Sequence, residues 1–98
     1  MAIKVLIKRK IKNNKLNEAS KLLIKERYAA MGQQGYISSE TLTDFDDPNT
    51  VMVISMWQKI ENWNQWKNTD LRSEIDTGFE ALLDGSTKYE YYNLGLVL

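Results

Sequence analysis

Chemically versatile side chains are concentrated between Val51 and Arg72. This segment holds all three tryptophans of the chain, Trp57, Trp63 and Trp66, and it ends at the arginine. An indole ring stacks well on a flat aromatic molecule, and a guanidinium group pairs with negative charge. We therefore expect a ligand to bind at this segment.

The chain lacks both histidine and cysteine. Without cysteine there is no disulfide framework, no thiolate nucleophile and no thiolate-bound iron–sulfur cluster. Without histidine the usual general base, metal ligand and haem ligand are missing. Acidic residues cluster at Asp44, Asp46 and Asp47, but they lack the spacing and the glycine of a calcium loop. The sequence predicts no cofactor and no metal, so proton transfer would fall to tyrosine, glutamate or water.

Length, charge and hydropathy limit the class of protein. The 98 residues predict a single domain that spans residues 1–98. The first 27 residues hold nine basic and two acidic side chains, yet they lack the interleaved aromatic residues of a nucleic-acid site. No apolar run reaches the ~20 residues of a membrane-spanning helix, and the N-terminus does not resemble a signal peptide. We expect a cytoplasmic protein that binds neither nucleic acid nor membrane.

The first half of the chain predicts a strand, a helix and a second strand. Apolar and charged residues alternate over residues 3–11, which is typical of a strand with one buried face. Apolar residues at helical spacing predict a helix over residues 15–31, which Asn14 would cap and Gly32 would end in a left-handed conformation. A second strand is expected over residues 36–45.

The second half predicts a hairpin partner, two helices and a last strand. The turn at residues 46–49 joins the second strand to a third, over residues 50–58, in an antiparallel hairpin. A short helix carries Trp63 and Trp66. Thr69 or Asp70 can cap the next helix, whose apolar residues recur at four-three spacing. Gly85 is expected to close this helix. A last strand is expected over residues 87–94.

The order β-α-β-β-α-β predicts an α+β fold of the ferredoxin-like type, an antiparallel sheet with helices on one face. The third strand is apolar on both faces, because Met52, Ile54 and Met56 alternate with Val51, Val53 and Trp57. Helices on one face cannot bury both sets, and exposed apolar surface costs roughly 25 cal/mol per Å². We therefore expect a homodimer in which two sheets pack face to face.

The chain resembles the antibiotic biosynthesis monooxygenase family, a branch of the dimeric α+β barrel superfamily. The resemblance covers almost the whole chain. It rests on Gly35 to Leu42, Asp46 to Asn49, the strand that ends in Trp57, Glu61-Asn62-Trp63, Trp66, Arg72 and Leu82-Leu83. It implies a dimeric α+β barrel with a small pocket in each subunit.

The resemblance also implies a choice of chemistries. Some members of the family are cofactor-independent oxygenases that convert planar aromatic substrates to quinones, whereas others degrade haem. The haem branch needs a histidine ligand and an asparagine in the first strand, and this chain has neither. Similarity to the quinone-forming branch assigns catalytic roles to Asn62, Trp66 and Arg72. Substrate-binding roles fall to the aromatic residues Trp57, Trp63, Tyr36 and Tyr91.

Each of these residues also has a structural interpretation. Trp57 and Trp63 suit the core, whereas Trp66 is the tryptophan that we expect to line a pocket. Asn62 either stabilises an anion or caps a helix. Arg72 either reaches the pocket or pairs with Asp70, Glu74 or Asp76. The tyrosines of the last strand either reach the pocket or lie at the dimer interface.

Two functions remain open at this point. The first is a cofactor-independent monooxygenase that acts on a small planar aromatic or quinol-type molecule. The second is a non-catalytic dimeric module that binds a small molecule, and the lack of histidine and cysteine favours it.

Overall fold

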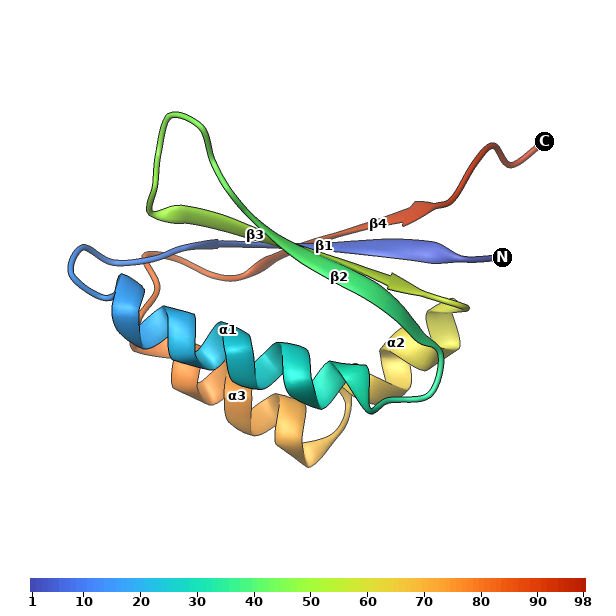
Figure 1. The fold of residues 1–98 in the computed structure, drawn as a ribbon, viewed down its shortest axis with the longest axis horizontal. Coiled ribbons are helices and arrows are strands. Elements are labelled where there is room, and N and C mark those ends of the chain that lie inside the picture. Colours follow the sequence, from blue (N-terminus) through green and yellow to red (C-terminus); the bar gives the residue numbers. More distant parts are fainter.

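Residues 1–98 are described by a computed structural model, in which a four-stranded sheet is covered by helices on one face (Figure 1). The elements follow the chain in the order β1 (Ile3–Lys10), α1 (Leu16–Met31), β2 (Tyr36–Thr43), β3 (Thr50–Trp57), α2 (Ile60–Lys67), α3 (Asp70–Glu80) and β4 (Lys88–Asn93). None of the three helices is long and apolar enough to span a membrane.

All strand pairs are antiparallel, and the sheet has the order β2-β3-β1-β4. The predicted ferredoxin-like plan and the β2–β3 hairpin are therefore confirmed. The two central strands, β1 and β3, pair from Ile3 with Trp57 to Lys10 with Thr50. Strand β2 lies at one edge of the sheet, and only its β3 side has a strand partner.

The core lies between the sheet and the helices. Period-two alternation places Ile3, Val5 and Ile7 of β1 on the helix side, where each is at most 6% exposed. Apolar residues of the helices and of the segment after α3 pack against them: Ala19, Ala30, Trp63, Trp66, Ile75, Phe79, Leu82 and Leu83.

The expected helix ends are partly wrong. Asn14 has a φ of 66°, and Lys15, not Asn14, precedes the first residue of α1. Gly32 is not left-handed, because its φ is −84°. The predicted cap at Thr69 is confirmed, since its side-chain oxygen accepts a hydrogen bond from the backbone N–H of Arg72 at 3.2 Å. Helix α3 ends at Glu80, so Gly85 lies in the following loop instead of closing the helix.

The predicted strands are correct in number and slightly too long. β2 ends at Thr43 and not at residue 45, because the Asp44 carboxylate already accepts hydrogen bonds from the backbone N–H groups of Asp46 and Asp47, each at 3.0 Å. These bonds start the loop two residues before the predicted turn.

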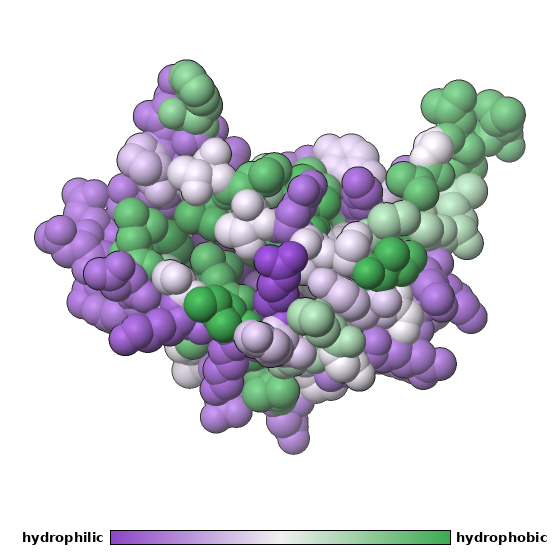
Figure 2. Space-filling view, in the orientation of Figure 1, coloured by the Kyte–Doolittle hydropathy of each residue, from purple (hydrophilic) through white to green (hydrophobic).

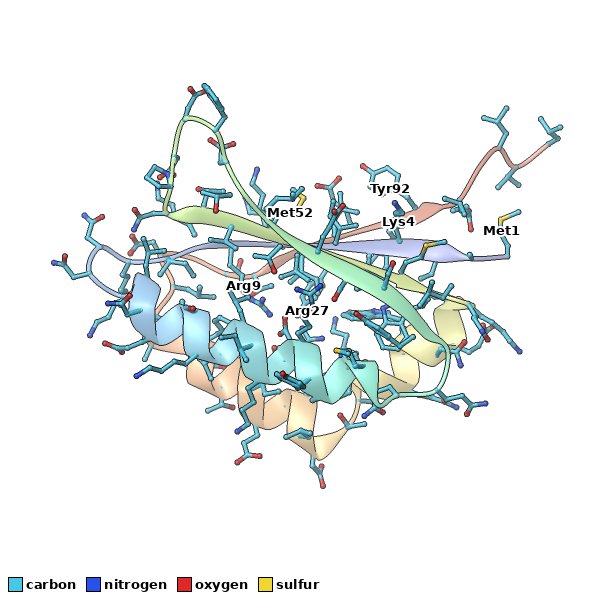
Figure 3. All side chains as sticks on the ribbon, viewed as in Figure 1. Met1, Lys4, Arg9, Arg27, Met52 and Tyr92 are labelled. Carbon is cyan, nitrogen blue, oxygen red and sulfur yellow. The ribbon has the colours of Figure 1, made fainter.

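The other face of the sheet carries no helix (Figure 1). Figure 3 shows Lys4, Met52 and Tyr92 on this face, whereas Arg9 and Arg27 lie between the sheet and the helices. We call it the open face. In register across the sheet, Ile54 lies next to Leu6 on one side and Glu40 on the other.

Gly35 forms the turn between α1 and β2. Its φ is +82°, a conformation that residues with a Cβ rarely adopt, and a Cβ there would overlap the side chain of Asn62 on α2. The backbone oxygen of Gly35 also accepts a hydrogen bond from the backbone N–H of Gln58 at 2.8 Å. Gly35 therefore fixes the distance between the start of β2 and helix α2.

We expect Gly35→Ala to lower the free energy of unfolding by about 2–4 kcal/mol, because it combines left-handed strain with a steric clash. Urea denaturation followed by circular dichroism measures this change. Gly85→Ala is the matched control, because Gly85 has a φ of +92° but open space around its Cα. It should cost about 1–2 kcal/mol from backbone strain alone. Equal losses in both variants would contradict the packing role of Gly35.

Candidate functional site

The three tryptophans form one aromatic cluster at the end of the sheet nearest α2. Trp57 ends β3, and Trp63 and Trp66 lie one turn apart on α2; each is at most 1% exposed. The ring centroids of Trp57 and Trp63 are 6.0 Å apart, and the planes are inclined by 65°. Tyr36 meets Trp57 edge-on at 5.6 Å. These edge-to-face contacts are the arrangement that aromatic pairs prefer, and they hold the cluster rigidly.

A buried ion pair joins β1 to α1 beside this cluster. Arg9 of β1 and Glu26 of α1 are 2% and 5% exposed. Two parallel hydrogen bonds connect them, from Nη1 to Oε1 at 3.2 Å and from Nη2 to Oε2 at 2.8 Å. The Arg9 guanidinium also lies 3.9 Å from the ring centroid of Phe79 on α3. Such bidentate geometry is the form in which a buried pair offsets the loss of hydration.

Arg72 is fully buried in the first turn of α3 and belongs to the same network. Its Nε donates to Asp76 at 3.2 Å and lies 3.6 Å from Glu26 Oε2. Its Nη2 donates to the Tyr89 hydroxyl at 3.0 Å. The remaining nitrogen, Nη1, is buried and has no hydrogen-bond partner. Of the three acids considered from the sequence, Asp76 is the one that pairs with this arginine.

Arg9 and Glu26 were missed as site residues, although the sequence pattern contains a signal for both. Arg9 occupies a helix-facing position in the alternation of β1, between Ile7 and Ile11. Glu26 stands in the apolar stripe of α1, between Leu23 and Ala30. One basic and one acidic residue that each interrupt a buried stripe are best explained as partners of each other.

Tyr89 of β4 connects the network to the aromatic cluster. Its ring centroid lies 6.0 Å from that of Trp63, and Lys67 Nζ lies 4.1 Å from the Tyr89 ring centroid. Burial raises the pKa of the Tyr89 hydroxyl above its ordinary value, and the positive charge of Arg72 opposes part of this effect. Tyr89 is therefore a neutral hydroxyl at physiological pH.

A cavity lies between α1, the β2–β3 side of the sheet and the tryptophan cluster. The void measures about 370 Å³ with its open mouth included, but the interior space for the centre of a water molecule is only about 20 Å³. The cavity is narrow in this conformation, and an aromatic ligand requires side-chain movement. The lining residues are Ile7, Leu23, Glu26, Arg27, Ala30, Ser39, Thr41, Val53, Ser55, Trp57, Trp63, Trp66 and Arg72.

Four of the seven predicted site residues line this cavity: Trp57, Trp63, Trp66 and Arg72. Tyr36 does not line the cavity, but its hydroxyl is hydrogen-bonded at 2.7 Å to the hydroxyl of Ser39, which does line it. Tyr91 is 48% exposed and touches the cluster through Trp63, with ring centroids 6.5 Å apart. The division that we expected between a core Trp63 and a pocket Trp66 does not appear, since both are buried and both line the cavity.

Asn62 lies outside the cavity lining. It is the third residue of α2, so it is not the cap of that helix, and its side chain packs against Gly35. Its Oδ1 is buried without a hydrogen-bond partner. Asn62 is thus a buried amide with a free acceptor next to the cavity wall.

Polar groups mark the mouth of the cavity, which we define by Arg27, Ser39 and Thr41. Arg27 and Thr41 are exposed and Ser39 is half-buried. Ser39 and Ser55 face each other across β2 and β3, and the Ser55 hydroxyl accepts a hydrogen bond from Trp57 Nε1 at 3.0 Å. No group of three or more acidic side chains suited to a metal ion occurs in the chain.

Comparison with known families and structures gives a consistent result. The model of a protein family described as antibiotic biosynthesis monooxygenase matches residues 2–75. No curated protein sequence matches the chain.

Several solved structures have the same fold. A conserved protein from Methanosarcina mazei Go1 superposes with a TM-score of 0.88 at 22% identity, over 94% of this chain and 91% of that chain. SnoaB, a cofactor-independent oxygenase from Streptomyces nogalater, superposes with a TM-score of 0.86 at 12% identity, over 99% and 96%. Rv0793 from Mycobacterium tuberculosis superposes with a TM-score of 0.88 at 8% identity, over 99% and 98%. At these identities the similarity establishes the fold and not the activity.

We expect Glu26→Gln to lower the free energy of unfolding by about 3–5 kcal/mol, because it leaves two buried guanidinium groups without their shared carboxylate. Urea denaturation measures the loss. Glu18→Gln on the same helix is the control, since the ion pair of Glu18 with Lys15 is solvent-exposed and should contribute less than about 1 kcal/mol. A loss at Glu26 no larger than the loss at Glu18 would show that the network does not stabilise the fold.

Proposed function

This chain belongs to the antibiotic biosynthesis monooxygenase family, and from that premise we propose that its cavity binds a small planar aromatic or quinol-type molecule and oxidises it with molecular oxygen, without a cofactor. The observation that carries this proposal is a buried guanidinium with a free N–H group in a wall that also contains three tryptophans. The indole rings suit the faces of a flat ligand, and the free Nη1 of Arg72 suits an oxygen on its edge.

The chemistry that fits these residues is oxidation at an activated ring carbon. Loss of a proton from such a carbon gives a carbanion whose charge is delocalised onto a ring oxygen. A buried N–H donor stabilises that oxygen far more than water does, because it is already oriented and lies in a region of low dielectric. The carbanion then reduces molecular oxygen. Overall, a ring CH2 group and O2 become a carbonyl group and water.

The proton acceptor is not Glu26, since its carboxylate is held by Arg9 and Arg72. Tyr89 does not line the cavity, and the oxygen of its neutral hydroxyl already accepts a hydrogen bond from Arg72. The proton therefore passes to water at the mouth, or the ligand ionises before it binds. This fits a substrate whose ring carbon is itself acidic.

A second candidate function is binding without catalysis. The small interior space and the lack of histidine and cysteine favour it. In that case the same wall holds a flat molecule, and no oxygen is consumed.

We expect anthrone-type substrates to quench the tryptophan fluorescence in a saturable manner and to cause oxygen uptake. Arg72→Lys keeps the positive charge but removes the planar guanidinium, so it should lower kcat at least about tenfold, as for the loss of an oxyanion donor. Trp66→Phe should mainly weaken binding. An oxygen electrode and a fluorescence titration give the two readouts.

Tyr28→Phe on the exposed side of α1 is the control, because Tyr28 is 74% exposed and does not line the cavity. Saturable quenching without oxygen uptake would replace the oxygenase by the binding module. No quenching by any flat ligand would contradict both functions.

We further propose that the open face is the contact surface of a homodimer. Its centre is apolar, with Leu6, Met52, Ile54 and Met56 half-buried in the isolated chain and Leu42 at 44% exposure. Unpaired charges of both signs surround this centre, among them Lys4 and Glu40. An apolar centre with a charged rim is the usual composition of a protein–protein interface.

The surface area of the chain supports this proposal. The accessible surface is 6401 Å², whereas a folded monomer of 11.4 kDa has roughly 5,800 Å². Figure 2 shows apolar side chains on two projections, the loop after β2 and the segment after β4, which rise on the open side of the sheet. Phe45 in the first is 99% exposed and Leu96 in the second is 83% exposed. A second copy on the open face would lie between these projections.

We expect the protein to sediment as a dimer and Ile54→Glu to weaken association at least 100-fold, which corresponds to about 3 kcal/mol. Analytical ultracentrifugation over a range of concentrations measures this. Ile24→Glu on α1 is the control, because Ile24 is 55% exposed and lies on the helix side of the sheet. A monomeric wild-type protein, or equal effects of the two variants, would contradict the proposed contact surface.

A further inference from the structure

Access to the cavity lies between α1 and the edge strand β2. Arg27 crosses this opening, because its Nη2 on the helix donates to the Ser39 backbone oxygen on the strand at 2.7 Å. Figure 3 shows Arg27 in the layer between α1 and the sheet. The hydrogen bond therefore spans the mouth of a cavity whose inner wall includes the buried side chains of Trp57, Trp63 and Arg72.

Arg27 is the one arginine without a carboxylate partner. Arg9 and Arg72 both pair with Glu26 and approach Asp76, whereas Arg27 forms no ion pair. Its hydrogen bond to Ser39 is the single bond that its side chain makes. A guanidinium group has five N–H donors, so most of those on Arg27 are free.

The charge of the cavity wall is positive. The lining contains two arginines, Arg27 at the mouth and Arg72 inside, and one acid, Glu26. Glu26 is already shared between Arg9 and Arg72. Because low-dielectric walls focus the field of such charges, the cavity attracts anions and repels cations.

We propose that the ligand is a planar organic acid, and that Arg27 binds its carboxylate at the mouth and releases Ser39 as it does so. This inference rests on the proposed function and names the class of ligand for the same cavity. A carboxylate is a charged, bidentate acceptor and replaces a neutral backbone oxygen, so the exchange favours the bound state. The Thr41 hydroxyl at the mouth is a further donor for the second carboxylate oxygen. The flat body of the ligand then lies along the tryptophans, toward the free Nη1 of Arg72.

The test compares two probes of the same shape and different charge, 2-naphthoate and 2-naphthamide, at pH 7. All three tryptophans line the cavity, so quenching of intrinsic fluorescence reports binding there. We expect the wild-type protein to bind naphthoate at least tenfold more tightly than naphthamide. Arg27→Gln keeps a polar side chain that can donate a hydrogen bond but loses the charge, so the preference should fall below threefold.

Lys25→Gln is the matched control, because it removes the same charge from an exposed position of α1 that does not line the cavity. It should keep the tenfold preference. A preference that persists in Arg27→Gln, or that Lys25→Gln abolishes equally, would overturn the role of Arg27. Binding of naphthamide with no preference for naphthoate would overturn this inference and leave the proposed function intact. If neither probe binds, the proposed function fails together with the inference.

Discussion

The folded state depends on a single carboxylate that serves two buried guanidinium groups. Glu26 of α1 contacts Arg9 of β1 and Arg72 of α3, so it links the sheet to both long helices. Each charge would be costly alone in the core, and together they still leave two buried nitrogens without a partner, Arg9 Nε and Arg72 Nη1. The network therefore holds the Arg72 guanidinium near the rings of Trp63 and Trp66, and the proposed function uses its unpaired Nη1 as the donor to a substrate oxygen.

Each strand contributes one set of side chains to the helix side of the sheet and another set to the open face. On the helix side, β3 contributes residues of the core and of the cavity, including Ser55 and Trp57. On the open face it contributes Met52 and Ile54, which no element of the chain covers. The cavity mouth lies on the helix side, so an assembly through the open face leaves ligand access unobstructed. The proposed binding site and the proposed contact surface thus lie on opposite faces of one sheet.

Much of the fold followed from local patterns, because alternation, turn residues and helical spacing all agreed. The site followed only in part. Trp57, Trp66 and Arg72 were identified since rare, chemically distinctive residues cluster in sequence. Their partner Glu26 was not, because the contact spans 17 residues to Arg9 and depends on two helices crossing the sheet at the right place. The environment of Asn62 was not predicted for a similar reason. Its amide packs against the turn at Gly35, which is distant in sequence.

The alternation of β3 also bears on how the length of this chain can vary among its relatives. Side chains of a strand have a period of two, so one inserted residue would exchange every position beyond it between the faces. An insertion early in β3 would bring Met56 into the cavity wall and turn Trp57 toward the open face. Strand β3 therefore does not tolerate a change in length. Insertions and deletions belong instead near Asp46 in the preceding loop, because the bonds that Asp44 makes there are local, whereas Asn49 at the end of the loop is bonded to Ile11.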